Sequence, residues 1–131
     1  MGRCVDLGKE IIMKEKIMNP KIWLTIVAVM HILMGVIVNY QHNGSIENLA
    51  MFIYFAIVSV YLFYVAFMTE GQTQARLATV LCAPVVVWFI IGAIMKLEMY
   101  GEPVAEMPFA LLPLTLWTMP ALFGIMNWNS D

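Results

Sequence analysis

Four long apolar runs constrain the fold of this chain more than any other feature of its sequence. They cover residues 22–39, 49–68, 77–95 and 107–126, and they contain no Asp, Glu, Lys or Arg. An apolar run of about 18 or more residues is typical of a helix that crosses a lipid bilayer. The composition agrees, because only 12% of the residues are charged, whereas a soluble domain carries about a quarter. We predict an all-α integral membrane protein.

Short connections join the four runs, so consecutive helices are expected to lie antiparallel. The predicted architecture is an up-down bundle of four transmembrane helices that forms one domain over residues 22–126. Residues 1–21 form a polar tail and residues 127–131 a short C-terminus. Within the tail, Glu10 and Lys14 lie four residues apart in the order that favours a helix. We interpret this segment as a frayed tail, with a short interfacial helix as the alternative.

The positive charges indicate how the bundle is oriented. Five of them precede the first run, one lies in the second connection, and one lies on the other side: Arg3, Lys9, Lys14, Lys16 and Lys21, then Arg76, then Lys96. Lys and Arg concentrate on the cytoplasmic side of membrane helices. We therefore expect both termini in the cytoplasm, and we expect the protein in a bacterial inner (plasma) membrane.

His31 is the histidine that lies inside an apolar run. It is nine residues into the first run, about 13 Å from the cytoplasmic edge at about 1.5 Å per residue. A charged imidazole near the middle of a bilayer would cost several kcal/mol, so we expect the neutral form. Ala28 and Gly35 lie three residues before and four after it. Small residues at this spacing let another helix approach closely, so the ring is predicted to face protein.

Side chains at a similar depth define a candidate intramembrane polar site: His31, Ser59, Trp88 and Thr115. One interpretation is a structural clasp between the first and fourth runs. In that case the imidazole bonds to the Leu116 carbonyl, which Pro120 deprives of its helical donor, or to Thr115; a structural bond to Ser59 of the second run is the other possibility. The alternative is a proton-transfer or ligand site, because an ionisable group in a membrane is a functional candidate.

No metal and no cofactor are predicted. The second histidine, His42, would lie about 16 Å from His31 along the helix axis, so the two cannot ligate one haem iron within a subunit. The cysteine and histidine spacings do not match a zinc site.

Prolines and glutamates complete the candidate features. Pro84, Pro113 and Pro120 are predicted inside helices, where each removes a backbone hydrogen bond and bends the helix. Such bends either leave a cavity or let neighbouring helices fit each other. Glu98, Glu102 and Glu106 form an outward acidic patch, and the simpler interpretation is a solvated turn with Glu106 at a helix start.

The sequence favours a non-enzymatic membrane protein that binds a lipid or hydrophobic molecule, or that supports a larger membrane complex. Membrane lipid is the expected partner, and the apolar, methionine-rich surface is compatible with a homo-oligomer or a membrane complex. No basic patch indicates nucleic acid. Two alternatives remain open: an oligomeric channel or proton-coupled transporter with His31 in the pathway, and a redox or quinone-linked membrane subunit.

Overall fold

The structure is a computed structural model of the chain. It describes residues 2–130, with side chains from residue 5 onward. In chain order its elements are α1 (Gly2–Ile17), α2 (Pro20–Met30), the π-helix η1 (His31–Val38), α3 (Asn39–Asn43), α4 (Leu49–Met68), α5 (Gly71–Met95), β1 (Glu98–Met99), β2 (Glu102–Pro103) and α6 (Leu111–Met126).

The first predicted span is longer than its apolar run, because α2, η1 and α3 continue one another from Pro20 to Asn43. Asn19 caps its start, accepting a hydrogen bond from the Lys21 amide at 2.9 Å. Pro20 follows in the first turn, where a missing N–H costs the helix nothing. The helical rod therefore begins two residues before the run. It ends at Asn43, inside the polar connection between the first and second runs.

Helix α4 has the predicted bounds, but α5 begins six residues before the predicted 77. The added turns are mostly polar, and their buried polar side chain is Gln74. Its side-chain amide donates to the carbonyls of Val65 (3.0 Å), Ala66 (3.1 Å) and Thr69 (2.8 Å). These carbonyls lie at the end of α4, where the last carbonyls of a helix have no N–H partner within it. Gln74 thus caps α4 from α5, which a hydropathy pattern cannot reveal.

Helix α6 begins at Leu111, four residues after the predicted start of the fourth span. Among residues 2–130, three helices are long and apolar enough to cross a membrane (20–43, 49–68 and 71–95), and α6 is a shorter apolar helix. This pattern is compatible with an all-α membrane protein. The late start corrects two expectations: Pro113 lies in the first turn rather than the helix interior, and Glu106 precedes α6. Pro84 and Pro120 do lie inside helices.

The third connection is a small β-hairpin. Glu98 pairs with Pro103 and Met99 with Glu102 in antiparallel register. The two residues between the strands, Tyr100 and Gly101, have φ values of 60° and 77°. Positive φ at both positions defines a type I′ turn, whose twist matches that of the strands. The sequence pattern predicts a turn here but not the pairing of the strands.

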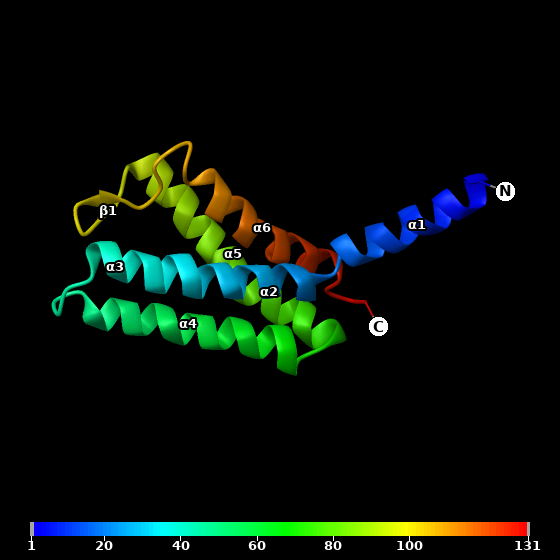
Figure 1. Cartoon of the computed structure of the whole chain (residues 1–131), viewed down its shortest axis with the longest axis horizontal. Helices are drawn as coiled ribbons and strands as arrows, with labels where there is room; N and C mark the ends of the chain where they lie inside the picture. Colours follow the sequence, from blue (N-terminus) through cyan, green and yellow to red (C-terminus); the bar gives the residue numbers. More distant parts are fainter. Residues whose placement is uncertain (1, 131) are drawn as a thin grey trace.

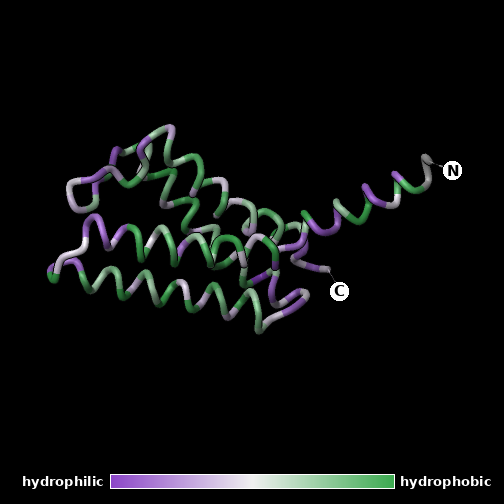
Figure 2. Tube along the Cα trace, viewed as in Figure 1, coloured by the Kyte–Doolittle hydropathy of each residue, from purple (hydrophilic) through white to green (hydrophobic). Residues whose placement is uncertain are grey.

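The helices form two pairs. The rod from α2 to α3 lies beside α4, and α5 and α6 form a second pair that crosses behind it (Figure 1). Both ends of the bundle domain lie together, because the Asn127 side chain donates to the Met18 carbonyl at 3.2 Å. Helix α1 projects away from the bundle at this end (Figure 1). Hydrophobic residues run along the bundle helices, and hydrophilic ones gather at their ends and along α1 (Figure 2).

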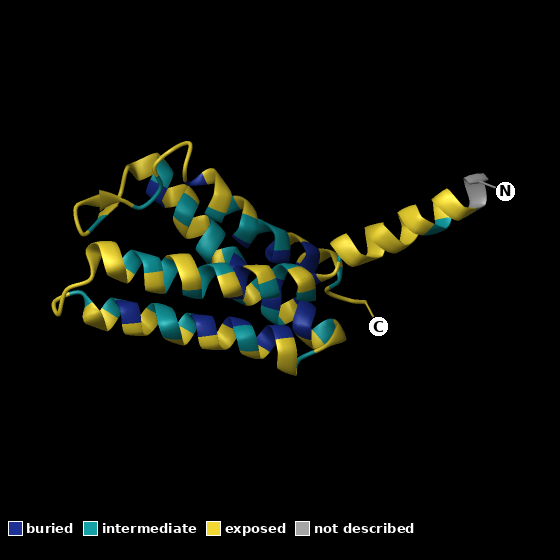
Figure 3. Cartoon of the chain, viewed as in Figure 1, coloured by how far each residue is buried: buried dark blue, intermediate teal, exposed yellow. Residues whose placement is uncertain are grey.

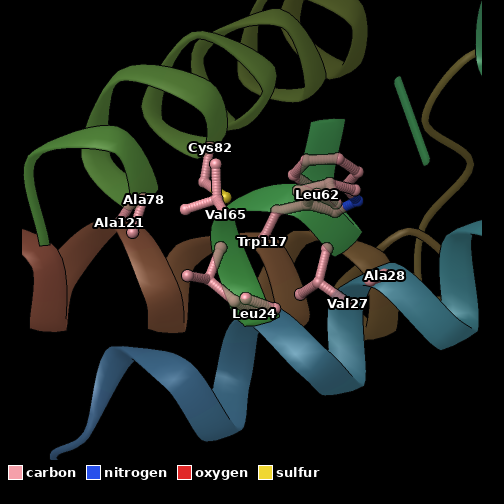
Figure 4. Packing of buried hydrophobic residues seen from close by; sticks show 10 residues of the cluster. Leu24, Val27, Ala28, Leu62, Val65, Ala78, Cys82, Trp117 and Ala121 are labelled. Atoms are coloured by element: carbon pink, nitrogen blue, oxygen red, sulfur yellow. The ribbon is translucent and has the colours of Figure 1, made fainter. Parts of the chain in front are cut away.

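The buried core lies where the two pairs meet, toward the terminal end. Figure 4 shows its side chains pointing toward one another from α2, α4, α5 and α6: Leu24, Val27, Ala28, Leu62, Val65, Ala66, Ala78, Cys82, Trp117 and Ala121. Many of these residues are small, which allows helices to approach closely. A Cβ added at Gly124 would overlap the Ala75 carbonyl and the Thr79 hydroxyl. The outer faces are exposed and apolar (Figure 3), as expected for helices that face lipid.

Candidate functional site

A cavity of about 820 Å³ lies between the two helix pairs, on the hairpin side of the core. The first pair contributes methionines and aromatic residues, among them Met30, Met34, Tyr54 and Phe55. The second pair contributes Pro84, Val85, Trp88, Phe89, Leu116 and Trp117. His31 and Gly35 also line it. The lining is therefore almost entirely apolar, with an imidazole as its main polar group.

Ser59 of α4 holds the His31 ring. Nδ1 of His31 lies 2.8 Å from the Ser59 hydroxyl oxygen. The same hydroxyl donates to the Phe55 carbonyl at 3.2 Å, one turn earlier in α4. Ser59 is buried, with 1% of its surface exposed. The imidazole, the hydroxyl and the carbonyl thus form a short hydrogen-bonded chain inside the protein.

Aromatic rings fix the orientation of the imidazole. The Trp117 ring of α6 lies 5.4 Å from it at an interplanar angle of 88°, and the Phe55 ring lies 5.8 Å away at 67°. Gly35 lies beneath the opposite edge, because a Cβ added there would be 3.4 Å from Cδ2 and 3.6 Å from Nε2. His31 and Gly35 both line the cavity, so this edge of the ring lies beside it. Nε2 makes no hydrogen bond within residues 2–130.

The backbone changes its geometry at this residue. The amide of His31 bonds to the carbonyls of Val27 and Ala28, and the π-helix η1 runs from His31 to Val38. Pi-helical segments are rare and often occur at functional sites. The sequence carried no signal for η1, because the apolar run continues through it without a break.

Of the other predicted site residues, Trp88 lines the same cavity and Thr115 does not. Thr115 is exposed, and its hydroxyl donates to the Leu111 carbonyl at 2.7 Å. Leu116 contributes its side chain to the cavity, but the hydrogen-bond partner of the imidazole is Ser59. The expected clasp between the first and fourth spans is therefore corrected: the hydrogen bond joins the first and second, and α6 contacts the ring through Trp117.

The prolines divide between the cavity and the core. Pro84 and Pro113 line the cavity, whereas Pro120 is buried against the core. A bend that separates helices and a close fit between them were both expected from these residues. The structure contains prolines in both kinds of surroundings.

The hairpin forms the wall of the cavity farthest from the termini. Met99 and Val104 line it, and Val104 packs so closely on Gly92 that a Cβ at Gly92 would lie 2.9 Å from it. The Tyr100 hydroxyl contacts the Met51 sulfur, so the turn also touches α4. Sequence reasoning missed these residues, because only the paired strands place them over the cavity.

The predicted acidic patch is exposed. Glu98 and Glu102 lie on the hairpin strands, and Glu106 follows them outside α6. Within the described part of the chain, no three His, Cys, Asp or Glu side chains gather closely enough to hold a metal ion. The glutamates therefore lie as separate charges on a solvated edge.

The cavity combines a large apolar volume with one hydrogen-bonding edge. Sites for small hydrophobic ligands typically enclose about 300–1,000 Å³ and place a few polar groups in an apolar lining. Comparison of the chain with models of known protein families, with curated proteins and with solved structures finds no match.

Proposed function

We propose that this protein is a non-enzymatic membrane protein that binds a hydrophobic molecule between its two helix pairs. In this proposal four helices cross a bacterial inner membrane, with both termini in the cytoplasm. The observation that carries the proposal is the cavity of about 820 Å³ beside His31.

The residues that border the cavity support a ligand rather than a packing fault. Close packing is the rule in protein interiors, and voids larger than a water molecule are few. Here bulky side chains from five elements line one volume that is partly open to the outside, and the hairpin crosses its end. Aromatic and methionine side chains offer broad, adaptable contacts to an apolar molecule.

The distribution of charge supports the proposed orientation. Lys21 and Arg76 lie at the end of the bundle that holds both termini, and Arg76 donates to the Trp128 carbonyl at 3.2 Å. Glu98 and Glu102 lie on the hairpin at the other end. A membrane helix bundle usually keeps its basic residues on the cytoplasmic side.

Filling the cavity tests the proposal. Val85 lines the cavity on α5, so Val85→Trp would place an indole in the ligand volume. Ile94 on the same helix is 76% exposed, so Ile94→Trp places the same indole on the outer surface. We expect native mass spectrometry from mild detergent to find a small hydrophobic molecule on the natural protein and on Ile94→Trp, and none on Val85→Trp.

Equal retention by Val85→Trp and Ile94→Trp would contradict the proposal, because the bound molecule would then lie outside the cavity. A natural protein that carries no molecule and takes up no added apolar compound would contradict it as well.

A further inference from the structure

We propose that the molecule bound in the cavity carries a neutral hydroxyl group on an aromatic ring, as a phenol or a hydroquinone does, and that this hydroxyl donates a hydrogen bond to Nε2 of His31. This inference rests on the proposed function and specifies its ligand class. It follows from counting the protons in the chain that joins His31, Ser59 and Phe55.

Ser59 has one hydroxyl proton to donate. Its oxygen lies 3.2 Å from the Phe55 carbonyl, to which it donates, and 2.8 Å from Nδ1 of His31. If the hydroxyl proton serves the carbonyl, the shorter contact is a hydrogen bond only when Nδ1 carries a proton. If Ser59 instead donated its proton to Nδ1, its hydroxyl would have no proton left for a hydrogen bond to the Phe55 carbonyl. The first arrangement makes two hydrogen bonds and the second makes one.

A neutral imidazole with its proton on Nδ1 has a free lone pair on Nε2. The neutral form is the one that suits this site, because the side chains around the ring are apolar or aromatic and a charge in a membrane interior is costly. Ser59 therefore determines the tautomer, and the tautomer makes the cavity edge of His31 a hydrogen-bond acceptor.

An acceptor at this position discriminates between ligands. Among the described residues Nε2 is unpaired, and it is accessible rather than sealed in the protein, so a ligand that donates a proton to it gains a hydrogen bond there. An ether, ester or ketone presents a second acceptor and gains no hydrogen bond from Nε2. An anion such as a fatty carboxylate would bring an unpaired charge into an apolar cavity. The neutral hydroxyl is the group that meets both conditions.

The walls favour an aromatic carrier for this hydroxyl. Trp117 and Phe55 already pack against the imidazole, and Trp88 and Phe89 line the facing side from α5. Aromatic rings pack well against one another in edge-to-face and offset geometries. The remaining cavity is wide and apolar enough for a hydrocarbon tail.

Two probes that differ by one methyl group test the inference. 4-Octylphenol donates a hydrogen bond, and 4-octylanisole, its methyl ether, cannot. Their affinities for the full chain in lipid nanodiscs are measured through tryptophan fluorescence, and the same ratio is measured for His31→Leu. Dividing the two ratios removes the difference in how the probes partition into lipid. We expect about a fivefold to tenfold preference for the phenol in the natural protein, as one hydrogen bond gives, and its loss in His31→Leu.

The outcomes separate this inference from the proposed function. If both probes bind equally to the natural protein, and Val85→Trp blocks both, the hydroxyl inference is wrong and the cavity function stands. If neither probe binds, or if Val85→Trp leaves both affinities unchanged, the proposed function fails.

The tautomer gives a second measurement that needs no His31 variant. In ¹⁵N NMR of imidazole-labelled protein, with His42→Gln to remove the second signal, we expect the His31 proton on Nδ1. Ser59→Ala removes the acceptor of that proton and should reduce the preference for the phenol. A proton on Nε2 in the natural protein would overturn the inference.

Discussion

The two ends of this bundle are built from the same kinds of helix, yet one is closed and the other is hollow. At the terminal end, Ala78, Ala121 and Gly124 let α5 and α6 approach until a single methyl group on Gly124 would overlap its neighbours. At the hairpin end, Phe55 and Trp88 face a cavity. Side-chain size therefore sets the separation of the helices in a chain that is apolar throughout.

The polar groups differ in the same way. At the closed end, Gln74 and Thr79 give their protons to backbone carbonyls of α4 and α5. At the open end, His31 is bonded through one ring nitrogen, and its other nitrogen borders the cavity. Closed regions of a membrane bundle use their polar atoms internally, and a polar atom left free beside a cavity is available to a ligand.

The largest expected contrast comes from adding the same aromatic ring at two positions of α5, one in the closed core and one beside the cavity. Ala78 is fully buried at the closed end, so Ala78→Phe forces the neighbouring helices apart and should lower the free energy of unfolding by about 3 kcal/mol or more. Val85→Phe places its ring in the cavity and should leave stability nearly unchanged. Unfolding by denaturing detergent measures both. Equal losses would mean that the two ends are packed alike.

A single methyl group tests the closed end alone. Gly124→Ala should cost about 1–3 kcal/mol, because the new Cβ meets the Ala75 carbonyl and the Thr79 side chain. Gly8→Ala is the matched control, since nothing lies within 4 Å of a Cβ at that position in α1. Thermal unfolding of both variants makes the comparison. A Gly124→Ala protein as stable as Gly8→Ala would show that α5 and α6 are not in close contact.

Breaking the hydrogen-bonded chain at Ser59 and at His31 should have unequal effects. Ser59→Ala leaves the Nδ1 proton of His31 without an acceptor and should cost about 1 kcal/mol. His31→Leu should cost less, because Ser59 keeps its hydrogen bond to the Phe55 carbonyl. Parallel denaturation curves give the difference. A larger loss for His31→Leu would contradict the assigned direction of the chain.

The smallest expected effect lies at the surface of the closed end. The Arg76 guanidinium donates to the Trp128 carbonyl and lies 5.6 Å from the centre of its ring. Arg76→Gln should therefore cost about 0.5 kcal/mol and change the Trp128 fluorescence. Lys9→Gln in the exposed helix α1 serves as the control. An unchanged Trp128 emission in Arg76→Gln would show that the contact does not form.

Hydropathy predicted the helices. The errors lie at helix ends, which hydropathy does not determine. It missed the early start of α5, because Gln74 is helical through hydrogen bonds to a neighbouring helix. It placed the start of the fourth span too early, because Met107 to Ala110 are apolar without being helical in α6. Apolar composition records preference for lipid, and it does not record the backbone partners that begin or end a helix.

The site was predictable in part. Depth along the helices suggested Ser59 among three partners for His31, and the structure has that hydrogen bond. Depth also suggested Thr115, which points elsewhere, because equal depth does not specify the face of a helix. The π-helix and the hairpin at the end of the cavity depend on tertiary contacts, so no local sequence pattern predicts them.

The most direct test of the cavity is photolabelling with an alkylphenol that carries a diazirine, followed by peptide mapping of the full chain in lipid. We predict saturable labelling of residues 27–35 and 84–89, which border the cavity, and its displacement by excess 4-octylphenol. Labelling confined to outward positions such as Ile94 and Met68, with no displacement by the competitor, would contradict a ligand site beside His31.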